Sequence, residues 1–183
     1  MAVQESEEKA EWYVMRDLKR PNAKQPAYKQ LGDMRFEVFT PMKWRMAVKQ
    51  GKRLREKVPF MQDLLFVHDT RGNLDPLVEK MPTLQYRYAR GESYRKPMTV
   101  PGDEMQRFIH AVSTSDSPKY YLPEEITPEM YRRKIRIVGG SLDGYEGHLL
   151  SMRGSKVKRL LVELPNFFSA GVEVNPEYIQ FVE

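Results

Sequence analysis

Hydrophobic positions in the first half of the chain alternate with polar ones over short runs, which is the pattern of β-strands. The run WYVMR predicts an opening strand at 12–16, and the apolar run at 63–69 predicts a central, buried strand. Two extended segments, 36–48 and 53–60, flank the glycine turn of KQGK. They predict a long β-hairpin. A further alternating run at 84–89 predicts another strand.

Helical positions lie between these runs. Ala27, Tyr28 and Leu31 predict a short helix with Pro26 in its first turn. Asp75 and Pro76 predict a second helix, with the Asp75 carboxylate as its cap and the proline at its first position.

A third helix is expected after Pro101. Its apolar residues recur at i, i+3, i+4 and i+7 and form one stripe, made of Met105, Phe108, Ile109 and Val112. The order of elements is then β-α-β-β-α-β-α. It predicts an α+β domain at 11–112, with an antiparallel sheet and helices on one face.

The composition changes after this helix. Residues 113–131 contain three prolines and many Ser, Thr and acidic residues without a period, so they predict a linker with local helix near PEEITPEMY. Residues 132–183 hold five short apolar runs between glycine-bearing turns, which predict a small β-barrel. Glycine inside a helix costs up to about 1 kcal/mol, so a helical hairpin is disfavoured there. Residues 1–10 are expected to form a disordered tail.

Length and composition limit the class of protein. The chain has 183 residues, of which 40% are hydrophobic, enough for two small domains. It contains no cysteine, which excludes disulfides and thiolate metal sites. The polar start and the absence of a long apolar run indicate neither a signal peptide nor a membrane anchor. We therefore expect a cytoplasmic protein without cofactors.

Charge is concentrated in one place. The net charge is only +5, but the stretch from Met42 to Lys57 holds seven basic residues and one acid, Glu56. Such a stripe can neutralise phosphates along a nucleic acid. The alternative is a solvated hairpin whose lysines prevent edge-to-edge aggregation.

Residues for catalysis are not grouped in the sequence. His68, His110 and His148 fall in different predicted elements, and HExxH, GxxxxGK[ST] and a cysteine nucleophile are all missing. Asp143 and Glu146 are the carboxylates near the glycine-rich loop, where they suit a turn. We expect neither an enzyme nor a metal site.

The stretch IRIVGGSLDGYEGHLL at 135–150 resembles the KOW motif, in which two apolar strands and three glycines lie in register. The glycines of the motif are Gly140, Gly144 and Gly147. This resemblance implies that the C-terminal barrel is SH3-like.

The N-terminal half narrows the resemblance. EWYVMR, the basic hairpin, PFMQDLLFV and the helix after KPMTVP are similar to the N-terminal domain of NusG. With the KOW barrel, the whole chain resembles the NusG/Spt5 family of transcription elongation factors. Within it, the chain looks most like the specialised paralogues RfaH and the UpxY-type antiterminators of Bacteroides capsular polysaccharide operons.

The resemblance implies a function and partners. Such a protein binds the RNA polymerase clamp and the non-template DNA of the transcription bubble, and thereby suppresses pausing and termination. The KOW barrel of such a protein would bind a ribosomal protein or Rho, and a monomer is expected. The alternative is a ribosome-associated, RNA-binding KOW protein, favoured by a basic turn with Arg153, Lys156, Lys158 and Arg159.

The same resemblance indicates site residues. The family's LFPGY segment is replaced here by Phe60, Met61, Gln62, Asp63 and Leu64, so the docking surface must be built differently. The polymerase-binding candidates are Tyr13, Pro59, Phe60, Met61, Leu64, Leu74 and Leu77. The nucleic-acid candidates are Lys19, Arg20, Lys43, Arg45, Lys52, Arg53 and Arg55.

Overall fold

The chain forms two compact units in a computed structural model that describes residues 8–21, 23–91 and 96–183. The first unit comprises the residues up to Met42 and Pro59–Asp103, and the second comprises Lys43–Val58 and Glu104–Glu183. Part of the predicted tail, residues 1–7, lies outside the described residues. Across the described ranges, no helix is both long and apolar enough to span a bilayer.

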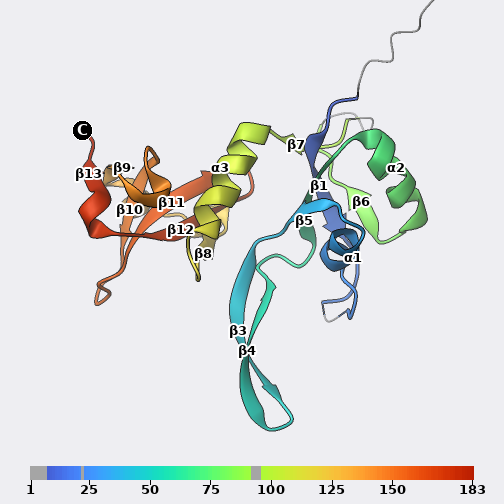
Figure 1. Ribbon diagram of the computed structural model, residues 1–183, viewed down its shortest axis with the longest axis horizontal. Helices are drawn as coiled ribbons and strands as arrows, with labels where there is room; N and C mark the ends of the chain where they lie inside the picture. Colours follow the sequence, from blue (N-terminus) through green and yellow to red (C-terminus); the bar gives the residue numbers. More distant parts are fainter. Residues whose placement is uncertain (1–7, 22, 92–95) are drawn as a thin grey trace, which may run out of the picture. The chain divides into compact units, whose positions relative to one another are not determined.

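An antiparallel sheet organises the first unit (Figure 1). Its main path runs in the order β2 (Glu37–Phe39), β5 (Leu64–Asp69), β1 (Glu11–Asp17) and β6 (Leu84–Tyr86), and β7 (Thr99–Val100) also pairs with β1. The strand expected to be central is confirmed, because β5 has a neighbour on each side.

The core of this unit lies between one face of the sheet and two helices, α1 (Ala27–Asp33) and α2 (Arg71–Lys80). Strand side chains alternate between faces, so Tyr13, Met15, Leu65 and Val67 point the same way. They pack in one cluster with helical residues Ala27, Leu31, Leu74 and Leu77. The opposite face is apolar as well, because Trp12, Val14, Leu64 and Phe66 are buried.

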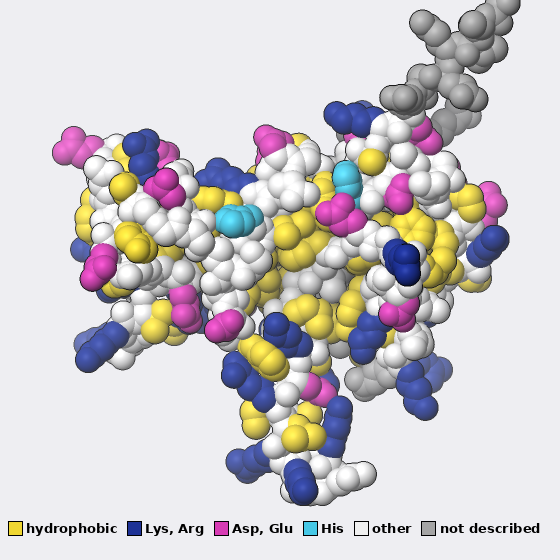
Figure 2. Space-filling model, viewed as in Figure 1, with side chains coloured by type: hydrophobic (Ala, Val, Ile, Leu, Met, Phe, Trp, Pro, Cys, Tyr) yellow, Lys and Arg dark blue, Asp and Glu magenta, His cyan; other side chains and the backbone are white. Residues whose placement is uncertain are grey.

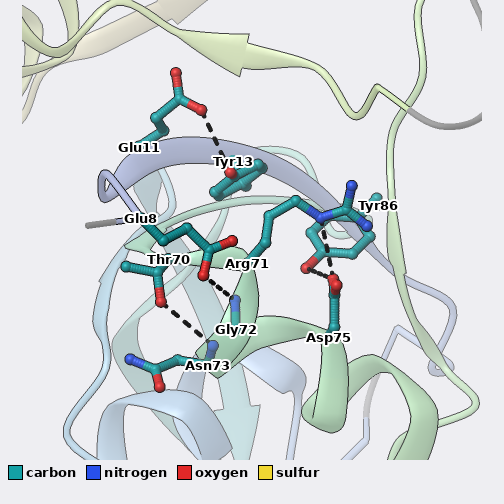
Figure 3. Close-up of polar contacts among 9 residues, drawn as sticks. All are labelled: Glu8, Glu11, Tyr13, Thr70, Arg71, Gly72, Asn73, Asp75 and Tyr86. Carbon is teal, nitrogen blue, oxygen red and sulfur yellow. Dashed lines mark hydrogen bonds and ion pairs between the residues drawn. The ribbon is translucent and has the colours of Figure 1, made fainter. Parts of the chain in front are cut away.

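The start of α2 differs from the prediction. The helix begins at Arg71, and its cap is Thr70, whose Oγ1 accepts a hydrogen bond from the amide of Asn73 at 3.3 Å (Figure 3). Asp75 lies inside the helix, where its carboxylate accepts from Arg71 Nε at 3.2 Å and from the Tyr86 hydroxyl at 2.7 Å. The prediction that Asp75 caps α2 was therefore wrong. Pro76 is accommodated within the helix, without an N–H to donate.

A second antiparallel sheet organises the C-terminal unit (Figure 1). Its order is β13 (Ile179–Phe181), β9 (Lys134–Ile137), β10 (Glu146–Ser151), β11 (Lys158–Leu164), β12 (Phe168–Val174) and β8 (Lys119–Tyr121). Ile135, Ile137 and Leu160 are buried on it. In the part of the chain that the structure describes, no ladder joins β8 to β13. The α+β class is thus confirmed, and a closed barrel stays a prediction.

Part of the segment expected to be a linker joins this sheet. Tyr120 of β8 pairs with Ala170 and packs its ring against Phe168, with centroids 5.9 Å apart. Two 3-10 helices follow, Pro123–Glu125 and Pro128–Tyr131, at the place where local helix is predicted. The proposed domain limits, 11–112 and 132–183 with a linker at 113–131, stay predictions.

The third helix, α3 (Gly102–Ser113), packs against the C-terminal sheet. The Phe108 ring meets Phe168 edge-on at 5.4 Å. Beside this contact, Arg107 donates to the carbonyl oxygen of Glu146 at 3.0 Å, and His110 Nε2 donates to that of Ser141 at 2.8 Å. The predicted stripe is buried at Met105, Phe108 and Val112, whereas Ile109 is only partly covered.

The glycines of the KOW-like stretch have two different roles. Gly140 and Gly144 have positive φ values of 70° and 82°, which favour glycine. Gly147 lies in β10 with ordinary φ, but a Cβ there would lie 2.5 Å from the Leu161 carbonyl oxygen and 2.8 Å from Leu160 Cδ1. The backbone of the neighbouring strand β11 thus lies close to Gly147, as predicted.

We expect Gly147→Val to lower the free energy of unfolding of the C-terminal unit by about 1–3 kcal/mol. The reason is that β10 and β11 must separate to admit the side chain. Thermal melting followed by circular dichroism measures this loss. Gly32→Ala is the control, since an added Cβ there meets no atom within 4 Å and its φ is not positive. A wild-type melting temperature for Gly147→Val would show that the close approach is unimportant.

Candidate nucleic-acid and partner-binding surfaces

The basic stretch forms a two-stranded hairpin of β3 (Met42–Lys49) and β4 (Lys52–Pro59), which confirms the hairpin. The extent predicted for its first strand, 36–48, was wrong, because Glu37–Phe39 form β2 and pair with β5 instead. The turn residues Gln50 and Gly51 have φ values of 52° and 75°. Two successive positive values define the tight turn that suits a twisted hairpin. A two-residue turn pairs Lys49 with Lys52 and sorts the other side chains onto two faces. Figure 2 shows Lys and Arg side chains gathered along this hairpin.

One face, here named the ion-pair face, carries the only acidic residue of the hairpin. Glu56 accepts from Arg45 at 2.6 Å and from Lys49 at 2.9 Å. Hydrogen bonds from Lys49 and then Arg45 lower the pKa of the Glu56 carboxyl to about 2. Arg45 and Lys49 are therefore engaged within the protein. The cations of the ion-pair face are Lys43, Arg45, Lys49 and Lys52.

The other face, here named the aromatic face, combines an apolar strand with a basic one. Trp44, Met46 and Val48 on β3 are 38%, 63% and 70% exposed. Beside them on β4 lie Arg53, Arg55 and Lys57. The Arg55 guanidinium lies 4.4 Å from the centroid of the Trp44 ring and the Lys57 ammonium 5.1 Å from it, which are cation–π distances. Trp44 Nε1 donates to the carbonyl oxygen of Asp116 at 3.1 Å.

The two candidate cations of the first unit differ in their surroundings. Lys19 Nζ donates to the carbonyl oxygen of Gln25 at 2.6 Å and to Gln30 Oε1 at 2.5 Å, so it holds the turn before α1. Arg20 is exposed. Of this pair, Arg20 is better placed to contact a phosphate.

Four of the polymerase-binding candidates lie in the interior. Tyr13, Leu64 and Leu77 are 4%, 2% and 9% exposed, and Leu74 is fully buried. Tyr13, Leu74 and Leu77 belong to the core cluster between the sheet and its helices. Their apolar area is already used for folding and offers little to a partner in this conformation.

The Tyr13 hydroxyl is also engaged within the unit (Figure 3). It donates to Glu11 at 3.3 Å, and its ring meets the Tyr86 ring at 5.7 Å. Burial, followed by the nearby Glu11 carboxylate, raises the pKa of Tyr13 to about 12. Burial and the hydrogen bond to Asp75 likewise raise the pKa of Tyr86. These contacts give Tyr13 a structural role.

The remaining candidates, Pro59, Phe60 and Met61, are partly exposed and adjacent in sequence. The amide of Phe60 donates to the carbonyl oxygen of Pro41 at 2.8 Å, which fixes the backbone where β4 ends. We name Pro59–Met61 the docking segment. It is the part of the candidate polymerase surface whose side chains are accessible.

The histidines and loop carboxylates have structural partners. His68 stacks on Trp12 at 5.0 Å, and Tyr131 meets His148 edge-on at 5.0 Å. Asp143 Oδ1 accepts from the Gly139 amide at 2.7 Å, while Glu146 pairs with Arg136. Among the described residues, no group of three His, Asp or Glu side chains could hold a metal ion.

Four residues of the aromatic face were not among the sequence candidates, namely Trp44, Met46, Val48 and Lys57. The signal for them was present, since WRMAV and RLREK both alternate with period two. This alternation assigns residues to a face only once the length of the turn is known. A turn longer by one residue would exchange the faces of one strand relative to the other.

Comparison with known proteins identifies the class. The family model described as "Transcription termination factor nusG" matches residues 10–109. A search of curated proteins found no match. Since the family match covers more than half of the chain, the protein belongs to the NusG family. Proteins of this family are non-enzymatic transcription elongation or antitermination factors that bind RNA polymerase.

The lowered pKa of Glu56 predicts a measurable titration. Because the folded-state pKa of about 2 lies below the ordinary value of 4.5, the ion pairs stabilise the hairpin above about pH 4.5, and this stabilisation is lost as the pH falls toward 2. Carbon-detected NMR titration of the carboxyl should show this value at low salt. Arg45→Ser with Lys49→Ser should return it to about 4.5, and a wild-type value near 4.5 would contradict the ion-pair geometry.

Proposed function

We propose that this protein is an operon-specific transcription antitermination factor that binds the RNA polymerase clamp and the non-template DNA of the transcription bubble. The observation that carries the proposal is the NusG family match over residues 10–109. The resemblance to RfaH and UpxY-type proteins supports the more specific role at capsular or surface polysaccharide operons. By bridging polymerase and DNA, the protein would hold the clamp closed and suppress pausing and termination.

The docking segment is the proposed polymerase contact. The polymerase clamp would present a pair of helices, and helices bind to apolar surfaces through a few anchoring side chains. The hydrogen bond between the Phe60 amide and the Pro41 carbonyl oxygen restrains the docking segment. Aromatic anchors can each contribute about 2 kcal/mol or more to an interface. Phe60 is therefore the proposed anchor, with Met61 and Pro59 beside it.

Arg20 and the hairpin are the proposed nucleic-acid contacts. A protein cation that binds a phosphate releases a counterion from the nucleic acid, so affinity falls as salt rises. Each contact contributes about 0.7 to 0.9 to the slope of log affinity against log salt concentration. The hairpin supplies most of these cations, and its exposure allows them to follow a phosphate backbone. Lys43, Arg45, Lys52, Arg53 and Arg55 remain candidates for this role.

Further parts of the proposal follow from the resemblance. The protein would act in the cytoplasm as a monomer without a cofactor, and its C-terminal sheet would bind a ribosomal protein or Rho. The competing function is binding of structured RNA on the ribosome. Arg153 and Lys156 favour it, since both are exposed in the turn after β10.

We expect Phe60→Ala with Met61→Ala to weaken binding to core RNA polymerase by about tenfold or more, because about 1.4 kcal/mol corresponds to tenfold. Biolayer interferometry with immobilised polymerase measures the affinity, and melting checks the fold. Met34→Ala is a matched control, as Met34 is an apolar residue of the same unit that is 52% exposed.

Two results would contradict this assignment. A folded double variant that binds polymerase as tightly as the wild type would place the contact elsewhere. A wild-type protein that recovers ribosomes from lysate and has no affinity for purified polymerase would favour the competing function.

A further inference from the structure

The aromatic face of the hairpin is an exposed surface that phosphate binding alone does not explain. Its three apolar side chains, Trp44, Met46 and Val48, remain substantially exposed. Three cations lie beside them on β4. Throughout residues 8–21, 23–91 and 96–183, no carboxylate lies within 4 Å of Arg53, Arg55 or Lys57. The face is therefore both apolar and uncompensated in charge.

We propose that the aromatic face binds an unpaired nucleic-acid strand, with a base stacking on the part of Trp44 that Arg55 and Lys57 leave exposed, and with phosphates contacting Arg53, Arg55 and Lys57. Single-strand sites combine a basic track for the backbone with aromatic rings on which the bases stack. Here the two components occupy neighbouring strands, which lie about 4.8 Å apart. One nucleotide strand running along the hairpin can meet both.

Geometry favours an unpaired strand over a duplex. In a duplex the bases are already stacked on each other, and only the phosphates face the protein. Trp44, Met46 and Val48 would then have no base to contact. The ion-pair face, with Ala47, Leu54 and Val58 as its apolar residues, lacks a ring on which a base could stack. Only one face of the hairpin thus has both components.

Charge and position disfavour a lipid surface. Insertion of a hairpin into a bilayer places apolar residues at its tip, but the tip here is Lys49, Gln50, Gly51 and Lys52. The apolar side chains instead follow the length of β3. A polyanion that lies along the ribbon matches this arrangement better than a surface that meets its end.

This inference deepens the proposed function, since it assigns the hairpin to the unpaired DNA of the bubble and to one face. It can nevertheless be tested without polymerase. The full chain contains two tryptophans, and Trp12 is only 2% exposed. Quenching of tryptophan fluorescence by a stacked base would therefore report on Trp44 in the unaltered protein.

The first experiment titrates the full chain with oligothymidine of about 15 nucleotides at low salt, within the usual range of single-strand site sizes. We expect fluorescence quenching and an affinity at least about fivefold higher than for a duplex of the same length. Trp44→Ala should weaken binding about tenfold, as the stacking energy of one base predicts, whereas Trp44→Phe should retain most of it.

Matched charge variants separate the two faces. Arg53→Ser, Arg55→Ser and Lys57→Ser together should lower the logarithmic salt slope by about 2, because each lost phosphate contact accounts for about 0.7. Arg45→Ser, Lys49→Ser and Lys52→Ser remove the same charge from the ion-pair face. Since Arg45 and Lys49 already pair with Glu56, at most one phosphate contact is expected from this set, and the slope should change by less than half as much.

Several outcomes would overturn the inference. They are absence of quenching in the wild type, equal affinity for the duplex, equal slopes for the two triple variants, and binding to phosphatidylglycerol vesicles in preference to the oligonucleotide. Polymerase affinity is measured in parallel. If Trp44→Ala binds polymerase normally but loses the oligonucleotide, both proposals stand. If wild-type protein binds the oligonucleotide but not polymerase, only the proposed function fails.

Discussion

A buried carboxylate at the end of β1 ties the sheet of the first unit to the start of α1. Asp17 is 5% exposed, and it accepts hydrogen bonds from the amides of Ala27 at 2.6 Å and Lys19 at 3.0 Å. The cap of α1 is Pro26, whose side chain cannot accept such bonds, so Asp17 supplies the missing acceptor from another element. Since β1 also pairs with β5, β6 and β7, the sheet and the start of α1 depend on the same strand.

The sequence predicts local structure well where one period dominates. The strands around Tyr13 and Phe66, the hairpin turn and strands β9 to β12 of the C-terminal unit follow from apolar patterning and glycine positions, whereas β8 lies in the segment predicted to be a linker. The start of α2 does not, because Thr70 and Asp75 are both good cap residues. What decides between them is tertiary: Arg71 and Tyr86 hold the Asp75 side chain within the helix.

Helix α3 shows a second limit of periodicity. Its stripe indicates that one face is buried but says nothing of the partner. The family match ends at residue 109, within this helix, while Phe108 packs on Phe168 of the C-terminal sheet. Residue type alone likewise does not predict which apolar residues form the proposed docking surface. Leu74 and Met61 are both apolar, yet one is buried in the core and the other is accessible.

The hairpin shows how the same charges acquire different roles. Composition counts seven cations, but the turn at Gln50 and Gly51 decides which of them share a face with Glu56 and which with Trp44. The indole N–H of Trp44 is held by Asp116, which fixes the ring while leaving 38% of the residue exposed. A ring already ordered in the free protein loses less entropy when a base stacks on it. Preorganisation of one aromatic residue would therefore distinguish the proposed binding face from the ion-pair face, although both carry similar charge.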